Sequence, residues 1–393
     1  MAISKKIKAS ISQSSMIRRM FEQGVELKKK FGADKVYDFS LGNPNVPPPE
    51  AFKNELIGLI REEIPFKHGY PPNAGIAEVR QAVADKISKT TGLKMEAGHI
   101  VMSCGAGGAL NVILKALLDP GDEVVVPVPY FVEYAFYVEN YGGVLTKAKT
   151  AEDFSLDISS LAGAITGRTK AVIINSPNNP TGRVYAENEI TALAKLLAQK
   201  GREYGKTIYL ISDEPYAEIV FDGIKVPSVL KAYPDSILAY SYSKTLSVPG
   251  ERIGYIAVNP AIDESSDLID AIILCTRISG FVNAPALMQR VIARLQDTKV
   301  DVEVYQKKRD LLCGGLSKAG YQFALPQGAF YLFVKSPLAD DVKFTEKLIE
   351  QNILAVPGSG FGAPGYFRIA YCVDDKVIAG SMEGFAAAIR ECV

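Results

Sequence analysis

Short apolar runs recur along the chain, and each ends at a turn that contains glycine, proline or polar residues. The runs that read as strands are residues 99–103, 123–129, 170–177, 207–214, 236–243 and 252–258. Between several of them apolar residues recur at helical spacing, as Ile190, Leu193 and Leu197 do within 187–205. Uninterrupted apolar strands that alternate with helices predict an α/β fold with a largely parallel sheet buried on both faces.

The C-terminal part of the chain has a different pattern. Segments 309–337 and 364–372 suggest hairpin-like strands packed against helices, which is typical of an α+β unit. We therefore predict a large α/β domain over residues 50–285. Residues 286–393 form a smaller domain in this prediction, together with an N-terminal arm in residues 1–49.

Composition excludes several classes of partner. The 393 residues include 44 Lys plus Arg and 44 Asp plus Glu, so the balanced charge argues against nucleic acid or an anionic membrane as the main partner. Two histidines make an imidazole metal site improbable, and no apolar run approaches the ~20 residues that span a bilayer. Five cysteines without a C-x-x-C pair predict a cytoplasmic location. The basic residues 1–21 faintly resemble a transit peptide, although we prefer an amphipathic arm.

Ligands of open α/β sheets bind beyond the carboxyl ends of the strands, and polar residues occur there in this sequence. Three glycines in 103–108 precede an apolar helix, which suits either a phosphate site or a tight turn without a ligand. The turn NSPNNPTG has either a structural role or a role in presenting Asn179 at the rim of the sheet. Asp213, with Tyr216 three residues on, is either a helix cap or a poorly solvated carboxylate that requires a cation.

Lys244 follows the apolar run 236–243, where desolvation would lower its pKa and make it an amine nucleophile that forms an imine with an aldehyde. Ser241, Ser243 and Arg252 form a cluster suited to a phosphate. Arg368 lies among apolar residues, and a carboxylate is its best partner.

These groups together describe a single ligand. It carries a phosphate, an aldehyde for Lys244 and a protonated ring nitrogen opposite Asp213. Pyridoxal phosphate has these three features, and Arg368 then remains for the α-carboxylate of an amino acid.

With these motifs in this order, the chain resembles the class I/II aminotransferases, pyridoxal-phosphate enzymes of fold type I with the aspartate-aminotransferase fold. The resemblance runs from YDFSLGNPN (37–45) through HGYPPNAGIAEVRQAVA, the glycine turn, NNPTG, DEPY and SYSK to FRIAYC (367–372). It implies a mostly parallel seven-stranded sheet between helices, a smaller α+β domain, and pyridoxal 5'-phosphate as cofactor.

The resemblance also implies roles for individual residues around the cofactor ring. Lys244 corresponds to the lysine that forms a Schiff base with the cofactor and later moves the α-proton. Asp213 corresponds to the carboxylate that pairs with the ring nitrogen, and Tyr216 and Asn179 to the groups that hydrogen-bond the phenolic oxygen. Phe131 corresponds to the aromatic residue stacked on the ring, with neighbouring Tyr130 as the less favoured choice.

The resemblance also implies which residues bind the phosphate and which bind the substrate. Arg368 corresponds to the residue that binds the substrate carboxylate, and Tyr70 to a tyrosine that reaches the phosphate of a neighbouring subunit, which implies a homodimer with shared active sites. The remaining residues that the resemblance places at the phosphate are Ser241, Ser243, Arg252, Ala106 and Gly107. Those that it places with Arg368 at the substrate are Gly42, Asn175 and Asn179.

The implied activity is ping-pong transfer of an amino group from an L-amino acid to a 2-oxo acid. Aspartate, alanine and aromatic or aliphatic donors stay open, because Gly107 stands where members specific for aspartate often have a lysine. Glu251 stands where a tryptophan is frequent, and its consequence is open. A carbon–sulfur β-lyase of the same fold is the alternative. A non-catalytic regulator that binds the cofactor is disfavoured, because residues 1–36 are too short for a DNA-binding helix-turn-helix.

Overall fold

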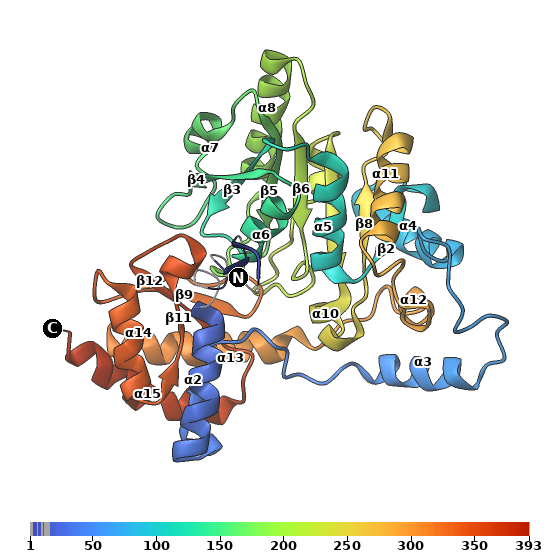
Figure 1. Cartoon of the computed structure of the whole chain (residues 1–393). Coiled ribbons are helices and arrows are strands. Elements are labelled where there is room, and N and C mark those ends of the chain that lie inside the picture. Colours follow the sequence, from blue (N-terminus) through green and yellow to red (C-terminus); the bar gives the residue numbers. More distant parts are fainter. Residues whose placement is uncertain (1–2, 6, 9–10, 12–15, 393) are drawn as a thin grey trace.

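The computed structural model describes residues 16–392 together with 3–5, 7–8 and 11, so part of the predicted N-terminal arm lies outside the described residues. Figure 1 shows two units side by side. The larger one surrounds an extended sheet. The smaller one contains the C-terminal elements, with helix α2 (Met16–Phe31) beside them.

A seven-stranded sheet with the order β2-β8-β7-β6-β5-β3-β4 forms the larger unit. Strand β8 pairs antiparallel with both neighbours, and all other pairs are parallel, which confirms the predicted mostly parallel sheet. Each predicted run corresponds to a strand. The sequence patterns missed β4, because this edge strand has mostly exposed or half-exposed side chains and no apolar run. The strands are β2 (Ile100–Ser103), β3 (Glu123–Val128), β4 (Val144–Lys149), β5 (Thr169–Asn175), β6 (Tyr209–Asp213), β7 (Ser236–Ser241) and β8 (Gly254–Val258).

Helices cover both faces of this sheet, because neighbouring strand residues point in opposite directions. In β3, Val125 enters the core on one face, whereas Val124 and Val126 enter the core on the other. The first core includes residues of α3 (Glu50–Arg61), α4 (Ala77–Thr91), α7 (Ile158–Ala164), α8 (Glu187–Tyr204), α9 (Val229–Ala232) and α12 (Ala286–Ala293). The second includes residues of α5 (Gly105–Leu117), α6 (Glu133–Asn140) and α11 (Ser265–Ile278).

The smaller unit is built on the antiparallel sheet β11-β12-β9 and the parallel pair β1-β10. Strands β9 and β12 pair antiparallel, but a long connection that contains α14 joins them, so the prediction of a hairpin was wrong. Residues 309–319 are helical, because Leu312, Cys313 and Leu316 lie on one buried face of α13. The elements are β1 (Tyr37–Asp38), α13 (Val302–Ala319), β9 (Tyr331–Lys335), α14 (Asp341–Glu350), β10 (Ile353–Leu354), β11 (Val356–Pro357), β12 (Tyr366–Ala370) and α15 (Asp375–Arg390). Short 3₁₀ helices are η1 (Ala33–Lys35), η2 (Ala97–His99), η3 (Pro249–Glu251) and η4 (Gly358–Phe361).

The predicted domain boundaries at residues 50 and 286 stay predictions. Helix α12, just beyond the second boundary, packs against α3 and α4 and shares the core of the large sheet. Within the part of the chain that the structure describes, no helix combines the length and apolarity needed to cross a membrane. All five cysteines are free.

Candidate active site

A cavity of about 370 Å³ lies where β5, β6 and β7 end, since the carboxyl ends of these parallel strands share one edge of the sheet. Every predicted site residue except Tyr70 lines it. These residues are Gly42, Ala106, Gly107, Phe131, Asn175, Asn179, Asp213, Tyr216, Ser241, Ser243, Lys244, Arg252 and Arg368.

Lys244 lies on the short helix α10 (Tyr242–Thr245), directly after β7. Its Nζ donates a hydrogen bond to the backbone oxygen of Gly42 at 2.9 Å. Burial lowers the pKa of Lys244 to about 8, and the nearby charges of Arg252 and Arg368 act in the same direction. Part of the lysine population is therefore a neutral amine near neutral pH, as a nucleophile or proton acceptor requires.

Asp213 ends β6 with its carboxylate buried. Its Oδ2 accepts a hydrogen bond from the Tyr134 hydroxyl at 2.5 Å, whereas Oδ1 has no partner among the described residues. Burial raises the pKa of Asp213 to about 7, and the Tyr134 hydrogen bond opposes this rise. A cationic N–H group placed at Oδ1 would satisfy this carboxylate.

Sequence reasoning missed Tyr134. It lies three residues beyond Phe131, and their rings meet edge to face with centroids 5.5 Å apart. The spacing of three between two aromatic residues was a signal that their rings could lie close together where α6 begins. Nothing in that spacing pointed to Asp213.

Donor groups gather at the start of α5 and around α10. The first N–H groups of α5 lack helical acceptors, as at any helix start. The Ser241 hydroxyl donates to Ser243 Oγ at 2.8 Å, and Arg252 Nη1 lies 3.4 Å from the same Ser243 oxygen. A side chain at Gly105 would put its Cβ 2.9 Å from Arg252 Nη2, so glycine permits this close approach. Hydroxyl, guanidinium and helix-start N–H groups together suit a phosphate dianion.

Arg368 reaches the cavity from β12 of the smaller unit. Its Nη1 donates to Asn179 Oδ1 at 3.0 Å and its Nη2 to the backbone oxygen of Ser40 at 2.6 Å. The guanidinium also lies over the rings of Tyr331 and Phe361, at 4.7 Å and 4.8 Å. These contacts hold a buried planar cation at the wall of the cavity, in a form suited to a carboxylate.

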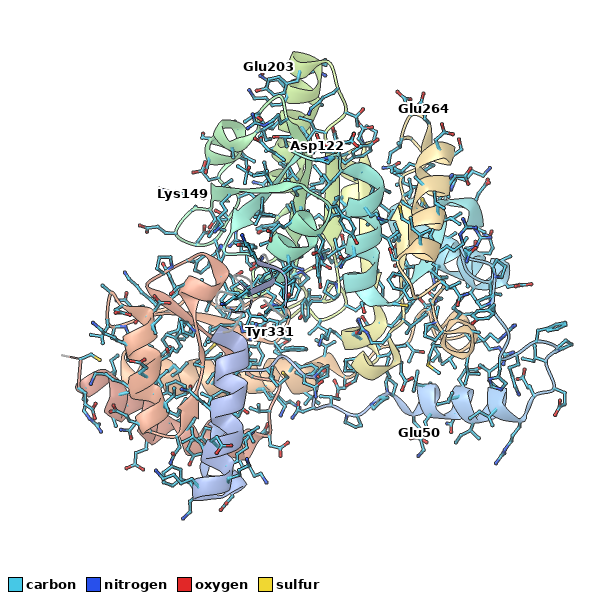
Figure 2. The ribbon with its side chains drawn as sticks, in the orientation of Figure 1. Glu50, Asp122, Lys149, Glu203, Glu264 and Tyr331 are labelled. Atoms are coloured by element: carbon cyan, nitrogen blue, oxygen red, sulfur yellow. The ribbon has the colours of Figure 1, made fainter. Side chains whose placement is uncertain are left out.

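Tyr331 is another residue that sequence reasoning missed. Its hydroxyl lies 2.9 Å from that of Tyr216, and Figure 2 places it between the two units. A Cβ at Gly42 would lie 1.9 Å from the Tyr331 hydroxyl oxygen, so a larger residue at 42 would displace the tyrosine. Tyr331 belongs to an apolar run, and no local pattern distinguished it from a core residue.

The other predicted residues differ in how they meet the cavity. The Asn175 side chain donates to the Asp213 backbone oxygen at 2.8 Å and accepts from the Asn179 N–H at 2.7 Å, so it braces the ends of β5 and β6. Tyr130 lies in the core and does not line the cavity. Tyr70 lies outside the cavity with 90% of its side chain exposed.

The cavity fits pyridoxal phosphate. Asp213 Oδ1 is an unpartnered acceptor for a protonated ring nitrogen, Lys244 is an amine with a lowered pKa, and donors for a phosphate gather at α5 and Arg252. These three features match the ring nitrogen, the aldehyde and the phosphate of the cofactor, respectively.

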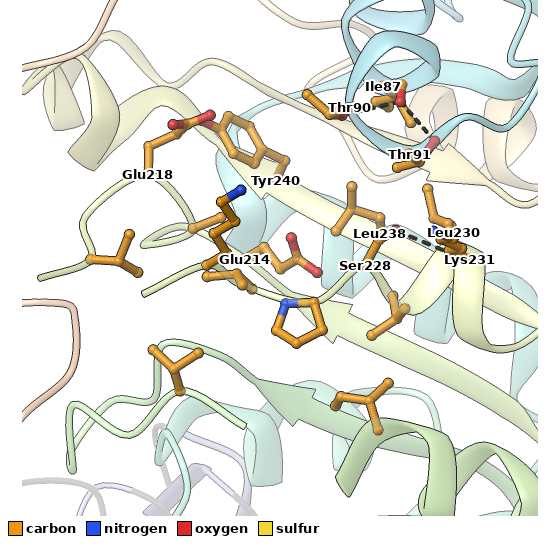
Figure 3. Close-up of a pocket in the computed structure, with 18 of the residues that line it drawn as sticks. Ile87, Thr90, Thr91, Glu214, Glu218, Ser228, Leu230, Lys231, Leu238 and Tyr240 are labelled. Carbon is orange, nitrogen blue, oxygen red and sulfur yellow. Dashed lines mark hydrogen bonds between the residues drawn. The ribbon is translucent and has the colours of Figure 1, made fainter. Parts of the chain in front are cut away.

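A larger cavity of about 1110 Å³ is shown in Figure 3, and Leu230, Leu238 and Tyr240, which belong to the core on one face of the sheet, line it. Glu214 and Tyr240 line it, whereas their neighbours Asp213 and Ser241 line the first cavity, because successive strand residues alternate in direction. Burial raises the pKa of Glu214 to about 7. The larger cavity contains none of the predicted site residues, so its size does not make it the active site.

Comparisons with known proteins identify the family of the chain. The family model described as aminotransferase class I and II matches residues 34–383. A probable aspartate/prephenate aminotransferase of Aquifex aeolicus is 33% identical over 93% of both chains, and one of Thermus aquaticus is 34% identical over 94% of both. Among solved structures, an amino transferase from Eubacterium rectale has a TM-score of 0.96 and 40% identity, covering 100% of this chain and 99% of its own. Aspartate aminotransferase from Thermus thermophilus with maleate has a TM-score of 0.86 and 29% identity, covering 99% and 100%.

Proposed function

This chain belongs to the class I and II aminotransferases and is a pyridoxal-phosphate-dependent transaminase, and we propose how its residues carry out the transfer of an amino group from an L-amino acid to a 2-oxo acid. The observation that carries the proposal is the meeting, in one cavity, of an amine with a lowered pKa and a buried carboxylate with an unpartnered oxygen. The β-lyase alternative is not favoured by the relatives.

Pyridoxal phosphate supplies an aldehyde carbon for the donor's amine and a ring that withdraws electrons from the donor's α-carbon. Lys244 Nζ accepts the proton that leaves that α-carbon, and in the reverse half of a ping-pong cycle it returns a proton to the α-carbon of the new amino acid. Asp213 Oδ1, which has no partner among the described residues, would hold the protonated ring nitrogen. Arg368 binds the α-carboxylate and orients the α-carbon toward Lys244.

The other lining residues hold the cofactor in place. Phe131 would pack against one face of the ring, and Tyr216 and Asn179 would donate to its phenolic oxygen. Gly42 and Asn175 support the substrate end beside Arg368 and Asn179. The residues assigned to the phosphate are Ser241, Ser243, Arg252 and the backbone at Ala106 and Gly107.

We also propose that the enzyme is a homodimer in which Tyr70 of one protomer contributes to the active site of its partner. The exposed side chain of Tyr70 lies in the loop between α3 and α4, and α3 runs along the lower edge of the larger unit in Figure 1. Phe66 in the same loop is also exposed. In a dimer this loop of one protomer would reach the phosphate residues of its partner. Sedimentation of the holoenzyme as a monomer at micromolar concentration would contradict this arrangement.

The proposal extends to the amino donor and to the location of the enzyme in the cell. The relatives are named for aspartate and prephenate, so aspartate is the first donor to test here. Free cysteines throughout are compatible with a reducing cytoplasm. Fractionation of the source cells that placed the enzyme elsewhere would refute the proposed location.

The experiment that tests this function combines Lys244→Ala with spectroscopy. We expect the variant to bind pyridoxal phosphate noncovalently and to lose transamination, because no other described lysine lines the cavity. Lys335→Ala, at an exposed position on β9, is the matched control and should keep full activity. Wild-type activity in Lys244→Ala, or a wild-type protein that takes up no pyridoxal phosphate, would refute the assignment.

A further inference from the structure

Glu133 is an acidic residue of the active-site cavity to which the proposed function gives no role. It is the first residue of α6, two positions after Phe131, and its side chain lines the cavity together with Tyr137, one turn further on. No hydrogen bond or ion pair joins its carboxylate to another residue that the structure describes. Burial raises the pKa of Glu133, and no nearby cation opposes that rise.

The proposed function already assigns a role to each cationic side chain that lines the cavity. Among the described residues that line it, the basic side chains are Lys244, Arg252 and Arg368, which the proposed function uses for proton transfer, phosphate and α-carboxylate. Gly107 contributes no side chain to the wall, and a Cβ there would lie 3.2 Å from the Tyr137 hydroxyl oxygen. No basic side chain among the described lining residues therefore remains for a second carboxylate on the donor.

Among the lining residues that one protomer contributes, the charge of Glu133 is negative and is not paired with a cation. A second carboxylate that entered beside Glu133 would meet a like charge where water is partly excluded, and such repulsion is stronger there than in bulk water. A side chain that ends in an ammonium or amide N–H group would instead give the Glu133 carboxylate a donor.

We propose that Glu133 is a specificity-determining residue that disfavours dicarboxylic donors and favours donors whose side chain ends in a nitrogen that carries hydrogen. This inference rests on the proposed function and names the substrate class of the same cavity. It separates this chain from what the names of its relatives suggest, since those names include aspartate.

A structural role is the competing explanation for Glu133. An acidic residue in the first turn of a helix is stabilised by the helix dipole, and α6 has no side-chain cap at its start. In that case replacing Glu133 would change thermal stability and leave the preference among donors as it was. The test therefore measures the preference itself.

The test uses the holoenzyme and donors that differ only in charge. Each donor is mixed with the enzyme without acceptor, and the change in cofactor absorbance gives an apparent second-order rate constant. The quantities compared are the asparagine-to-aspartate and glutamine-to-glutamate ratios. In the wild type we expect both ratios to exceed unity by about tenfold, equivalent to about 1.4 kcal/mol.

Three variants distinguish the explanations. Glu133→Gln removes the charge with little change in shape and should lower both ratios about tenfold, while the rate with alanine stays within about twofold. Glu133→Asp keeps the charge and should keep ratios above unity. Glu139→Gln removes an equal charge from an exposed position of the same helix and should leave the ratios unchanged.

A wild type that reacts faster with aspartate than with asparagine would overturn the inference. Equal ratios in Glu133→Gln and the wild type would also overturn it, even if Glu133→Gln melted at a lower temperature. If no amino acid changes the cofactor spectrum at all, the proposed function itself fails, which is a different result from reaction without preference.

Discussion

Replacing Tyr134 by phenylalanine should weaken cofactor binding through Asp213. The substitution deletes one hydroxyl and keeps the ring that meets Phe131 edge to face. That hydroxyl donates to Asp213 Oδ2 at 2.5 Å, and the two side chains are 1% and 4% exposed, so water does not replace the lost donor. Since Oδ1 has no partner either, the variant's carboxylate has no donor from the described protein.

The magnitude follows from the kind of hydrogen bond. A hydrogen bond to an ionised group contributes about 1.5–3 kcal/mol. Its loss raises the pKa of Asp213 further above about 7, so less of the residue is ionised to bind the protonated ring nitrogen. At 1.4 kcal/mol per factor of ten, the dissociation constant of pyridoxal phosphate at pH 7 should rise about 10- to 100-fold.

The assay is a titration of the cofactor-free protein with pyridoxal phosphate, followed by absorbance between pH 6 and pH 9. Tight binding in the variant should be confined to higher pH than in the wild type. Tyr141→Phe is the matched control, because that tyrosine caps the same helix and its hydroxyl contacts Asn111 rather than Asp213. A dissociation constant in Tyr134→Phe equal to that of Tyr141→Phe at every pH would refute the reasoning.

Two further predictions concern Asp213 and Arg368. In the cofactor-free protein the pKa of Asp213 is about 7 against an ordinary 3.8, so its contribution to the free energy of unfolding is fully present below pH 4 and declines as pH rises through 7. Chemical denaturation should show the wild type losing about 2–3 kcal/mol relative to Asp213→Asn between pH 5 and pH 8, and parallel curves would contradict the buried, unpaired carboxylate. Arg368→Lys loses the planar fork that binds a carboxylate, so the dissociation constants of all reactive donors should rise about tenfold or more with cofactor affinity preserved. An effect restricted to one donor would mean that Arg368 contacts the donor side chain instead.

Much of the sheet and part of the site could be predicted because they depend on local patterns. A continuous apolar run has to be buried, and in a parallel sheet the residues that follow such runs meet at one edge. Asn175, Asp213 and Lys244 each end or follow a run, so their convergence was predictable before any contact was known. Edge strand β4 was not predictable in this way, because an edge strand needs no continuous apolar run.

By itself, the sequence determined the order of the strands' apolar runs, the residues at their ends and, through these, the cofactor class. Only the tertiary structure decided which side chains from distant segments complete the cavity. Tyr134 reaches Asp213 from 79 positions away, and Arg368 reaches Asn179 across 189 positions. Tyr331 and Glu133 likewise join the wall from different units. No periodicity encodes such contacts, because they depend on how segments far apart in the sequence pack against one another. Lys244 and the cluster of Ser241, Ser243 and Arg252 could be predicted from the sequence, whereas the places of Tyr134, Tyr331 and Glu133 became evident only in the fold.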